Sequence, residues 1–363
     1  PGSVAVSNTA LAYTVTTTGA GKLTGTTTVL KQGTNSLTIN GSHDFTGNFT
    51  LAEGKVTIAN ANALGGTNST TIIQSNGTLD AAGQDLRTHK FIVAGSGLNG
   101  QGVILSSVQL QNCYRFVTMT GDTTFGAING TQWGLQSPTP GDGATNLNGN
   151  GFKLTKVGSG DCLLKDLGET YLGDIDILES SIAFQFSSTM GDPSRTCTVY
   201  SNGVLGLRNA TTATWNKVVV INGGVMRNNE NGAAADFHGP VTLNGLGEFF
   251  VTSASPPGLN MYGPIGGTGK LVKSDAGTLV LAAANTYTGM TVISNGTVQL
   301  ASSGSIANST NIFLRTSSAA FDVSAVSGYA LGAAQTLSGH GTIIGNVIAN
   351  GVVSPGSSAG KLT

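Results

Sequence analysis

The sequence predicts an all-β protein, and within that class a parallel β-helix (β-solenoid). Apolar and polar residues alternate in short runs such as TLVLA at 278–282, and Gly and Asn punctuate nearly every run. These runs are long enough for strands and too short and Gly-rich for helices. The pattern also recurs along the chain, and a repeat that cannot bury its apolar face alone buries it by stacking on its neighbours.

The repeat is visible as three aligned copies. Each copy starts at a lysine, has an aromatic residue two positions before its closing glycine, and the middle copy is one residue longer than the others. A later element recurs in the same order, as LNGQGVI at 98–104, LNGLGEF at 243–249 and LSGHGTI at 337–343. The aligned starts are Lys31–Gly47, Lys156–Gly173 and Lys273–Gly289, and the aromatics are Phe45, Tyr171 and Tyr287.

Nothing in the composition marks a domain boundary. We therefore expect one continuous β-solenoid over residues 1–363, a single elongated rod with long repeats at about 31–105, 156–250 and 267–350. Pro-Gly clusters at 138–143 and 253–258 predict extruded loops. A β-sandwich or propeller is the alternative fold. The SNG tripeptides at 75–77, 201–203 and 294–296 fit hairpin turns in that alternative and left-handed corners in a solenoid.

The phase of the alternation predicts which side chains form the core. In matched places of the repeats, one set of apolar residues falls on a single face of its strands. The predicted core comprises Leu37, Phe49, Leu51, Val56, Ile58, Leu79, Ile175, Ile177, Leu205, Leu279, Leu281, Ile293, Val298 and Leu300.

Charge and hydropathy argue against two further classes of protein, those that bind nucleic acid and those that span a membrane. Charged residues make up 10% of the 363 residues, against about 25% in typical soluble chains, and the formal net charge is −1. No basic patch stands out, so we expect no nucleic-acid partner, and no apolar run is long enough for a membrane span. The chain starts at Pro1 without a signal-like segment, so we expect a processed protein or a piece of a longer one.

Residues 267–300, GTGKLVKSDAGTLVLAAANTYTGMTVISNGTVQL, resemble the passenger-associated (autotransporter-associated) β-strand repeat of Gram-negative surface proteins. Asp275 stands where that repeat usually has a glycine. Residues 117–135 and 147–160 also resemble segments of giant repetitive bacterial surface proteins. The resemblance implies a right-handed parallel β-helix, exported and extracellular or at the cell surface of a Gram-negative bacterium, whose motif residues are structural and not catalytic.

One acidic cluster could carry chemistry. Carboxylates on one outer sheet of a β-helix can bind Ca²⁺ or perform acid–base catalysis, with Lys165 or Arg195 nearby. We interpret these acids as solvated surface charges, because Asn48 and Thr50 stand in the places of two of them in the first copy. We predict no catalytic, cofactor-binding or metal site. The cluster comprises Asp161, Asp166, Glu169, Asp174, Asp176 and Glu179.

Aromatic residues, histidines and cysteines are the other candidates for functional sites. Exposed aromatic rings could stack on sugars, although aromatics more often fill a core. The four histidines lack metal-ligand spacing. The three cysteines cannot all pair, so a Cys162–Cys197 disulfide and buried thiols are both open. The aromatics are Tyr114, Trp133, Tyr200, Trp215 and Tyr262, the histidines His43, His89, His238 and His340, and the third cysteine is Cys113.

Three functions fit these observations. The first is an extracellular structural surface protein, either a rod that stacks end to end on copies of itself into a fibre, or part of a giant surface protein. Both ends carry strand patterns without polar caps, and AGKLT occurs at 20–24 and 359–363. The alternative is an adhesin or carbohydrate-binding module that takes cell-surface or matrix polysaccharide. A polysaccharide lyase or hydrolase is disfavoured, and we expect no enzymatic activity.

Overall fold

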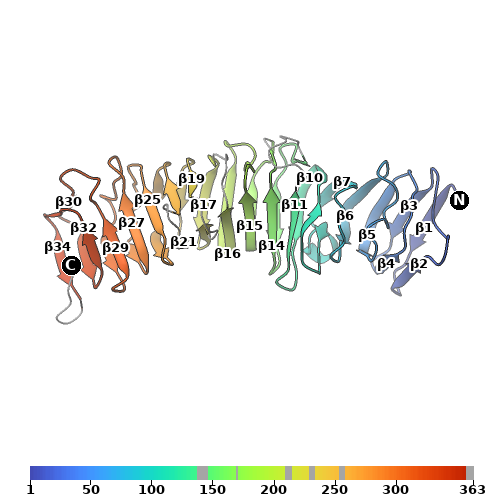
Figure 1. Ribbon diagram of the computed structural model, residues 1–363, viewed down its shortest axis with the longest axis horizontal. Coiled ribbons are helices and arrows are strands. Elements are labelled where there is room, and N and C mark those ends of the chain that lie inside the picture. The colour runs from blue at the N-terminus through green and yellow to red at the C-terminus, as the bar shows by residue number, and fades with distance from the viewer. Residues whose placement is uncertain (137–145, 169–170, 209–214, 229–233, 253–257, 357–363) are drawn as a thin grey trace. The chain divides into compact units, whose positions relative to one another are not determined.

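The computed structural model describes residues 1–136, 146–168, 171–208, 215–228, 234–252 and 258–356. The chain divides into two compact units, Pro1–Asp192 and Pro193–Thr363. Figure 1 shows the ribbon of the chain with many of its strands labelled. Both units consist of short strands joined by turns, with no α-helix in the described residues. Accordingly, the described part of the chain contains no helix that could cross a membrane.

The first unit contains the first fifteen strands and one short 3₁₀ helix, η1 (Leu98–Gly100). The strands are β1 (Ser3–Ser7), β2 (Tyr13–Thr16), β3 (Thr28–Gln32), β4 (Ser36–Asn40), β5 (Phe49–Ile58), β6 (Thr70–Asp80), β7 (Lys90–Gly95), β8 (Ile104–Leu105), β9 (Leu110–Tyr114), β10 (Phe116–Gly126), β11 (Gln132–Gln136), β12 (Leu147–Asn148), β13 (Leu154–Val157), β14 (Asp161–Lys165) and β15 (Ile175–Gln185).

The second unit contains the remaining strands. They are β16 (Thr196–Arg208), β17 (Val218–Asn222), β18 (Val225–Asn228), β19 (Ala235–Phe237), β20 (Val241–Leu243), β21 (Leu246–Val251), β22 (Leu259–Met261), β23 (Ile265–Gly267), β24 (Lys270–Ser274), β25 (Thr278–Leu281), β26 (Thr291–Ile293), β27 (Gly296–Leu300), β28 (Asn311–Leu314), β29 (Ala319–Asp322), β30 (Ala330–Leu331), β31 (Thr336–Gly339), β32 (Thr342–Ile344), β33 (Ile348–Ala349) and β34 (Val352–Pro355).

Strand pairing identifies the fold of each unit. The described pairings between strands are parallel, and each strand pairs with one roughly 20 to 30 residues further along the chain. In the second unit, Leu259 pairs with Leu279, which pairs with Val298. One coil therefore lies on the next, and the prediction of a parallel β-solenoid is confirmed. A sandwich or propeller would pair neighbouring strands as antiparallel hairpins. Three parts of the prediction stay predictions. They are the right-handed coiling of the β-helix, the one continuous domain and the single elongated rod.

The predicted core is confirmed residue by residue. All fourteen residues named from the repeat phase are at most 1% exposed. In strands with regular alternation the neighbours point outward: Val280, between Leu279 and Leu281, is only half-buried. In other strands the neighbours are buried too, as Thr78 and Asp80 are beside Leu79. Inward residues of successive coils lie directly over one another, so burial of this apolar surface stabilises the stack.

The corners differ in part from the sequence expectation. Gly296 has a φ of 67°, as a left-handed corner requires. Gly77 and Gly203 lie instead inside the continuous strands β6 and β16, without positive φ. The loops predicted at 138–143 and 253–258 lie outside the described residues, apart from Gly258.

Candidate functional site

The acidic residues near the second repeat do not form one group. Asp176 pairs with Lys153, with 3.1 Å between carboxylate oxygen and Nζ. Asp161 accepts a hydrogen bond from the Ser180 hydroxyl at 2.9 Å. Among the residues that the structure describes, no set of three or more His, Cys, Asp or Glu side chains could hold a metal ion. These contacts fit the interpretation as surface charges, and the lack of a catalytic or metal site stays a prediction.

The remaining members of this cluster are also separated. Asp166 is buried, so its interpretation as a solvated surface charge is wrong. One of its oxygens accepts a hydrogen bond from the Ser187 hydroxyl at 3.0 Å. Lys165 is buried and donates to the Gln111 side-chain oxygen at 3.2 Å. Arg195 is exposed in the second unit, whereas Lys165 belongs to the first. Asp174 is half-buried, Glu179 is exposed, and Glu169 lies outside the described residues.

The idea of an aromatic sugar-binding face is wrong for three of its five residues. Tyr114, Trp133 and Trp215 are fully buried. Trp133 donates its indole N–H to the Gly126 carbonyl at 2.6 Å and meets Tyr114 edge to face, with ring centroids 5.2 Å apart. Such rings fill the core of a coil and cannot reach a ligand. The signal was in the sequence, since Trp133 lies within an alternating strand.

The other two rings lie nearer the surface. Tyr262 is 48% exposed and stacks on the exposed His238, with ring centroids 4.7 Å apart. Tyr200 is half-buried. The pair of Tyr262 and His238 is too small a surface to define a binding face by itself.

The cysteines and two of the histidines are core groups. Cys113, Cys162 and Cys197 are all buried thiols, so of the two possibilities left open by the sequence the structure has buried thiols and not a Cys162–Cys197 disulfide. Burial raises the pKa of Cys162 to about 12, which keeps it protonated at neutral pH. His43 and His89 are buried as well, and burial lowers the pKa of both. His340, like His238, is exposed.

The lysine that opens each repeat has a structural role that sequence reasoning missed. Lys31, Lys156 and Lys273 are fully buried and occupy inward-facing places, in register with Leu51, Ile177 and Ile293 of the next coil. Each ammonium group donates hydrogen bonds to three backbone carbonyls at 2.6–3.2 Å. We call this arrangement the lysine clamp. The carbonyls belong to Gln32, Gly33 and Glu53; to Val157, Gly158 and Glu179; and to Ser274, Asp275 and Asn295.

The lysine clamp ties a corner of one coil to the coil above it. Two of its carbonyls belong to the two residues after the lysine, and the third lies two residues after the lysine's partner on the next coil. Burial lowers the pKa of Lys156 and Lys273 to about 8, so at neutral pH both donate as ammonium groups. The signal available in the sequence was the identical position of the lysine in three copies.

The clamp also explains the glycine that usually follows two residues after this lysine. Gly33 and Gly158 have φ values of 82° and 83°, in the left-handed region that favours glycine. Asp275 takes the same conformation, with a φ of 64°. Asp adopts it more readily than most residues, and here its side chain accepts a hydrogen bond from the Ala276 amide at 2.8 Å. The departure from the repeat pattern is therefore tolerated locally.

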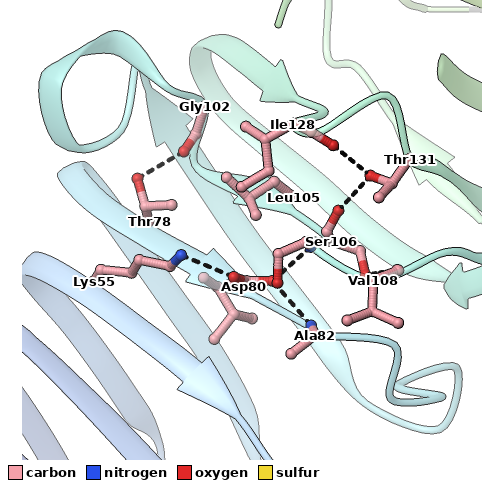
Figure 2. Close-up of polar contacts among 12 residues, drawn as sticks. Lys55, Thr78, Asp80, Ala82, Gly102, Leu105, Ser106, Val108, Ile128 and Thr131 are labelled. Carbon is pink, nitrogen blue, oxygen red and sulfur yellow. Dashed lines mark hydrogen bonds and ion pairs between the residues drawn. The ribbon is translucent and has the colours of Figure 1, made fainter. Parts of the chain in front are cut away.

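A second polar cluster in the first unit also links coils. The Asp80 carboxylate is 1% exposed and pairs with the Lys55 ammonium of the preceding coil at 2.8 Å (Figure 2). Its other oxygen accepts hydrogen bonds from the amides of Ala82 and Ser107, both at 2.9 Å. Three donors satisfy this buried carboxylate. Asp80 therefore holds three successive coils together and is not poised to act on a substrate.

Beside Asp80, neutral side chains make the same kind of link. The Thr78 hydroxyl donates to the Gly102 carbonyl at 2.7 Å, and the Thr131 hydroxyl lies 2.9 Å from the Ser106 carbonyl and 2.7 Å from that of Ile128 (Figure 2). These contacts satisfy buried backbone groups where the coils turn. These hydrogen bonds link neighbouring coils and make the stack rigid.

Comparisons with known proteins agree with this architecture. Residues 271–300 match the family described as Passenger-associated-transport-repeat. The chain is 27% identical, over 91% of its length, to the Adhesin BmaC autotransporter of Brucella suis biovar 1 (strain 1330), and spans 11% of that protein's length. No solved structure matches the chain. The protein is therefore a parallel β-solenoid that carries a passenger-associated transport repeat and is distantly homologous to an autotransporter adhesin.

Proposed function

We propose that this chain is a segment of an adhesin passenger, carried on the surface of a Gram-negative bacterium, that attaches its cell to another surface. The observation that carries the proposal is the similarity to an autotransporter adhesin across 91% of the chain, on a parallel β-solenoid. This similarity favours the adhesin alternative over the fibre that the chain ends suggested. Stacking on further copies of itself remains a prediction.

The solenoid suits this role physically. Apart from the lysines of the clamp, most of its inward side chains are apolar and closely packed, whereas the outward positions of strands such as β25 and β27 carry Thr, Val and Gln. A stack of coils offers a long surface on which residues of successive coils lie in rows about 4.8 Å apart. Repeat proteins of this kind use such extended surfaces for binding. Catalysis, by contrast, needs a positioned acid and base.

Adhesion by purified protein tests the proposal. Beads coated with the folded chain should attach to host-cell or polysaccharide surfaces more than beads coated at equal density with heat-unfolded chain. Sedimentation of the same sample at increasing concentration reports end-to-end association. Equal attachment of the two bead types would refute the adhesin role. If the sample formed long polymers and did not adhere, the fibre would be favoured over the adhesin.

A further inference from the structure

Two adjoining hollows lie on the outside of the first unit. One, of about 300 Å³, is lined by residues of β6, β7 and β10, among them Thr70, Lys90 and Phe116, and by Asn146 just before β12. The other, of about 440 Å³, lies over the turns that precede three of these strands and includes Arg87 and Arg115. They adjoin because Arg115 and Phe116 are consecutive. We call the two together the basic groove.

The basic groove crosses several coils in register. Lys90 pairs with Thr70 on the coil before and with Phe116 on the coil after. Inward neighbours such as Phe91 and Val117 are buried, which fixes the strands beneath. The groove is therefore a surface of a rigid sheet, and neighbouring coils add to it at about 4.8 Å per step.

The charge of the basic groove is unusual for this chain. Its lining includes three cationic side chains, Arg87, Lys90 and Arg115, and one carboxylate, Asp85, which gives a formal charge of +2. The whole chain has only 17 Lys and Arg and a net charge of −1. A hollow lined by one sign of charge concentrates ligands of the opposite sign.

Two of these cations are held in place. The Arg115 guanidinium lies over the Phe116 ring, 4.3 Å from its centroid, and its Nε donates to the Asn146 side chain at 2.9 Å. Arg87 is held by Asp85 through two contacts at 2.9 and 2.7 Å. Fixed cations lose less side-chain entropy when they bind a ligand. Lys90 is exposed between them and is the cation that a ligand reaches most directly.

We propose that the basic groove binds an anionic polysaccharide, with acidic groups of the polymer held by Lys90, Arg87 and Arg115. Hydroxyl and amide side chains along the groove, among them Thr70 and Thr118, supply hydrogen bonds for sugar hydroxyls. A polymer suits the site because the cations come from successive coils, so a chain lying across the strands meets more than one of them. This inference rests on the proposed adhesin function and names its ligand class.

Titration of soluble polymers against the folded chain tests the inference. The probes are polygalacturonate for carboxylate groups, dextran sulfate for sulfate groups, and dextran as the uncharged polymer. Binding of at least one charged polymer, with none of dextran, is expected and should weaken as salt is raised. Binding of the carboxylate polymer, the sulfate polymer or both identifies the anion. Absence of binding by both, or equal binding of dextran, would overturn the inference.

Matched variants locate the binding. Lys90→Gln should lower the affinity roughly tenfold, as expected for loss of one charge-assisted hydrogen bond. Lys270→Gln, which removes an equally exposed lysine on β24 of the second unit, should leave it unchanged. Equal affinity of the two variants would refute the basic groove as the site. Bead adhesion of the unmutated chain separates the two proposals: beads that adhere although the chain binds neither charged polymer would overturn the groove and retain the adhesin.

Discussion

At the scale of single residues, inward positions carry the stability of each coil. Leu279 is fully buried and lies in register between Leu259 and Val298 of the adjacent coils. An aspartate there would place an unpaired charge in a closely packed interior. We expect Leu279→Asp to lower the free energy of unfolding by about 4 kcal/mol or more, measured by urea denaturation.

The next residue provides the control for this change. Val280 points outward and is half-buried. Val280→Asp should therefore cost less than about 1 kcal/mol. Similar losses for both variants would show that the alternation does not decide burial in this strand.

The three thiols give a second prediction at this scale. Cys113, Cys162 and Cys197 are buried, and burial raises the pKa of Cys113 and Cys162 far above that of an exposed thiol. Since the thiolate is the reactive form, none should react with a thiol reagent at pH 8 in the folded protein. All three should react once a denaturant unfolds the chain. One rapid reaction in the native state would contradict this placement.

At the scale of elements, the lysine clamp is the arrangement that all three copies of the repeat share. Lys273→Met keeps an unbranched side chain, one atom shorter than that of lysine, and leaves three corner carbonyls without their donor. Buried carbonyls without a partner cost free energy. We expect the variant to be about 2 kcal/mol less stable than wild type at pH 7. An unchanged free energy of unfolding would show that the lysine clamp does not stabilise the fold.

The clamp also predicts a dependence on pH. Burial lowers the pKa of folded Lys273 to about 8, whereas the unfolded chain titrates near the ordinary value of 10.5. Between these values the unfolded state binds more protons, so folding is favoured as pH rises. The advantage of wild type over Lys273→Met should be constant below about pH 8 and should grow towards pH 10.5. Urea denaturation at a series of pH values measures it. A shrinking advantage would have the opposite sign and would show that the folded state favours the charged amine.

The ion pair at Asp80 gives a further prediction at this scale. Asp80→Ala leaves the Lys55 ammonium and two amides without their acceptor, so we expect a loss of about 3 kcal/mol. Asp80→Asn retains an acceptor for the amides and should lose less. Thermal unfolding of both variants orders them. Equal losses would assign the effect to the charge alone.

The sequence could predict some of these elements and not others. Strict alternation predicted that Leu279 and Leu281 point inward, because a period of two separates the faces of a strand. It could not predict a buried lysine, since lysine is rarely buried unless its charge is satisfied. Lys55 and Asp80 share no motif and meet only because their coils stack in one register. The basic groove likewise needs two stacked coils in place before its cations adjoin.

At the scale of the whole molecule, both units are parallel stacks, and the similarity to an adhesin extends over 91% of the chain. Parallel stacking explains how a chain with only 10% charged residues folds without an α-helix in its described part: every coil covers the apolar face of its neighbour. It also explains how one outer surface can collect cations that lie far apart in the sequence. The proposed adhesion and the proposed polysaccharide binding both depend on that stacking.

Distances across the second unit test this stacking most directly. Asp236, Gln299, Asp322 and Ile344 point outward and lie in one row, with Gln299 three steps, Asp322 four steps and Ile344 five steps from Asp236. Spin labels on cysteines placed at Asp236 and at each other site should give backbone separations of about 14, 19 and 24 Å, one strand spacing per coil. Pulsed electron paramagnetic resonance measures these separations. The control is the chain without added cysteines, which should take up no spin label because its three native thiols are buried. Separations that do not rise in equal steps would contradict the parallel solenoid.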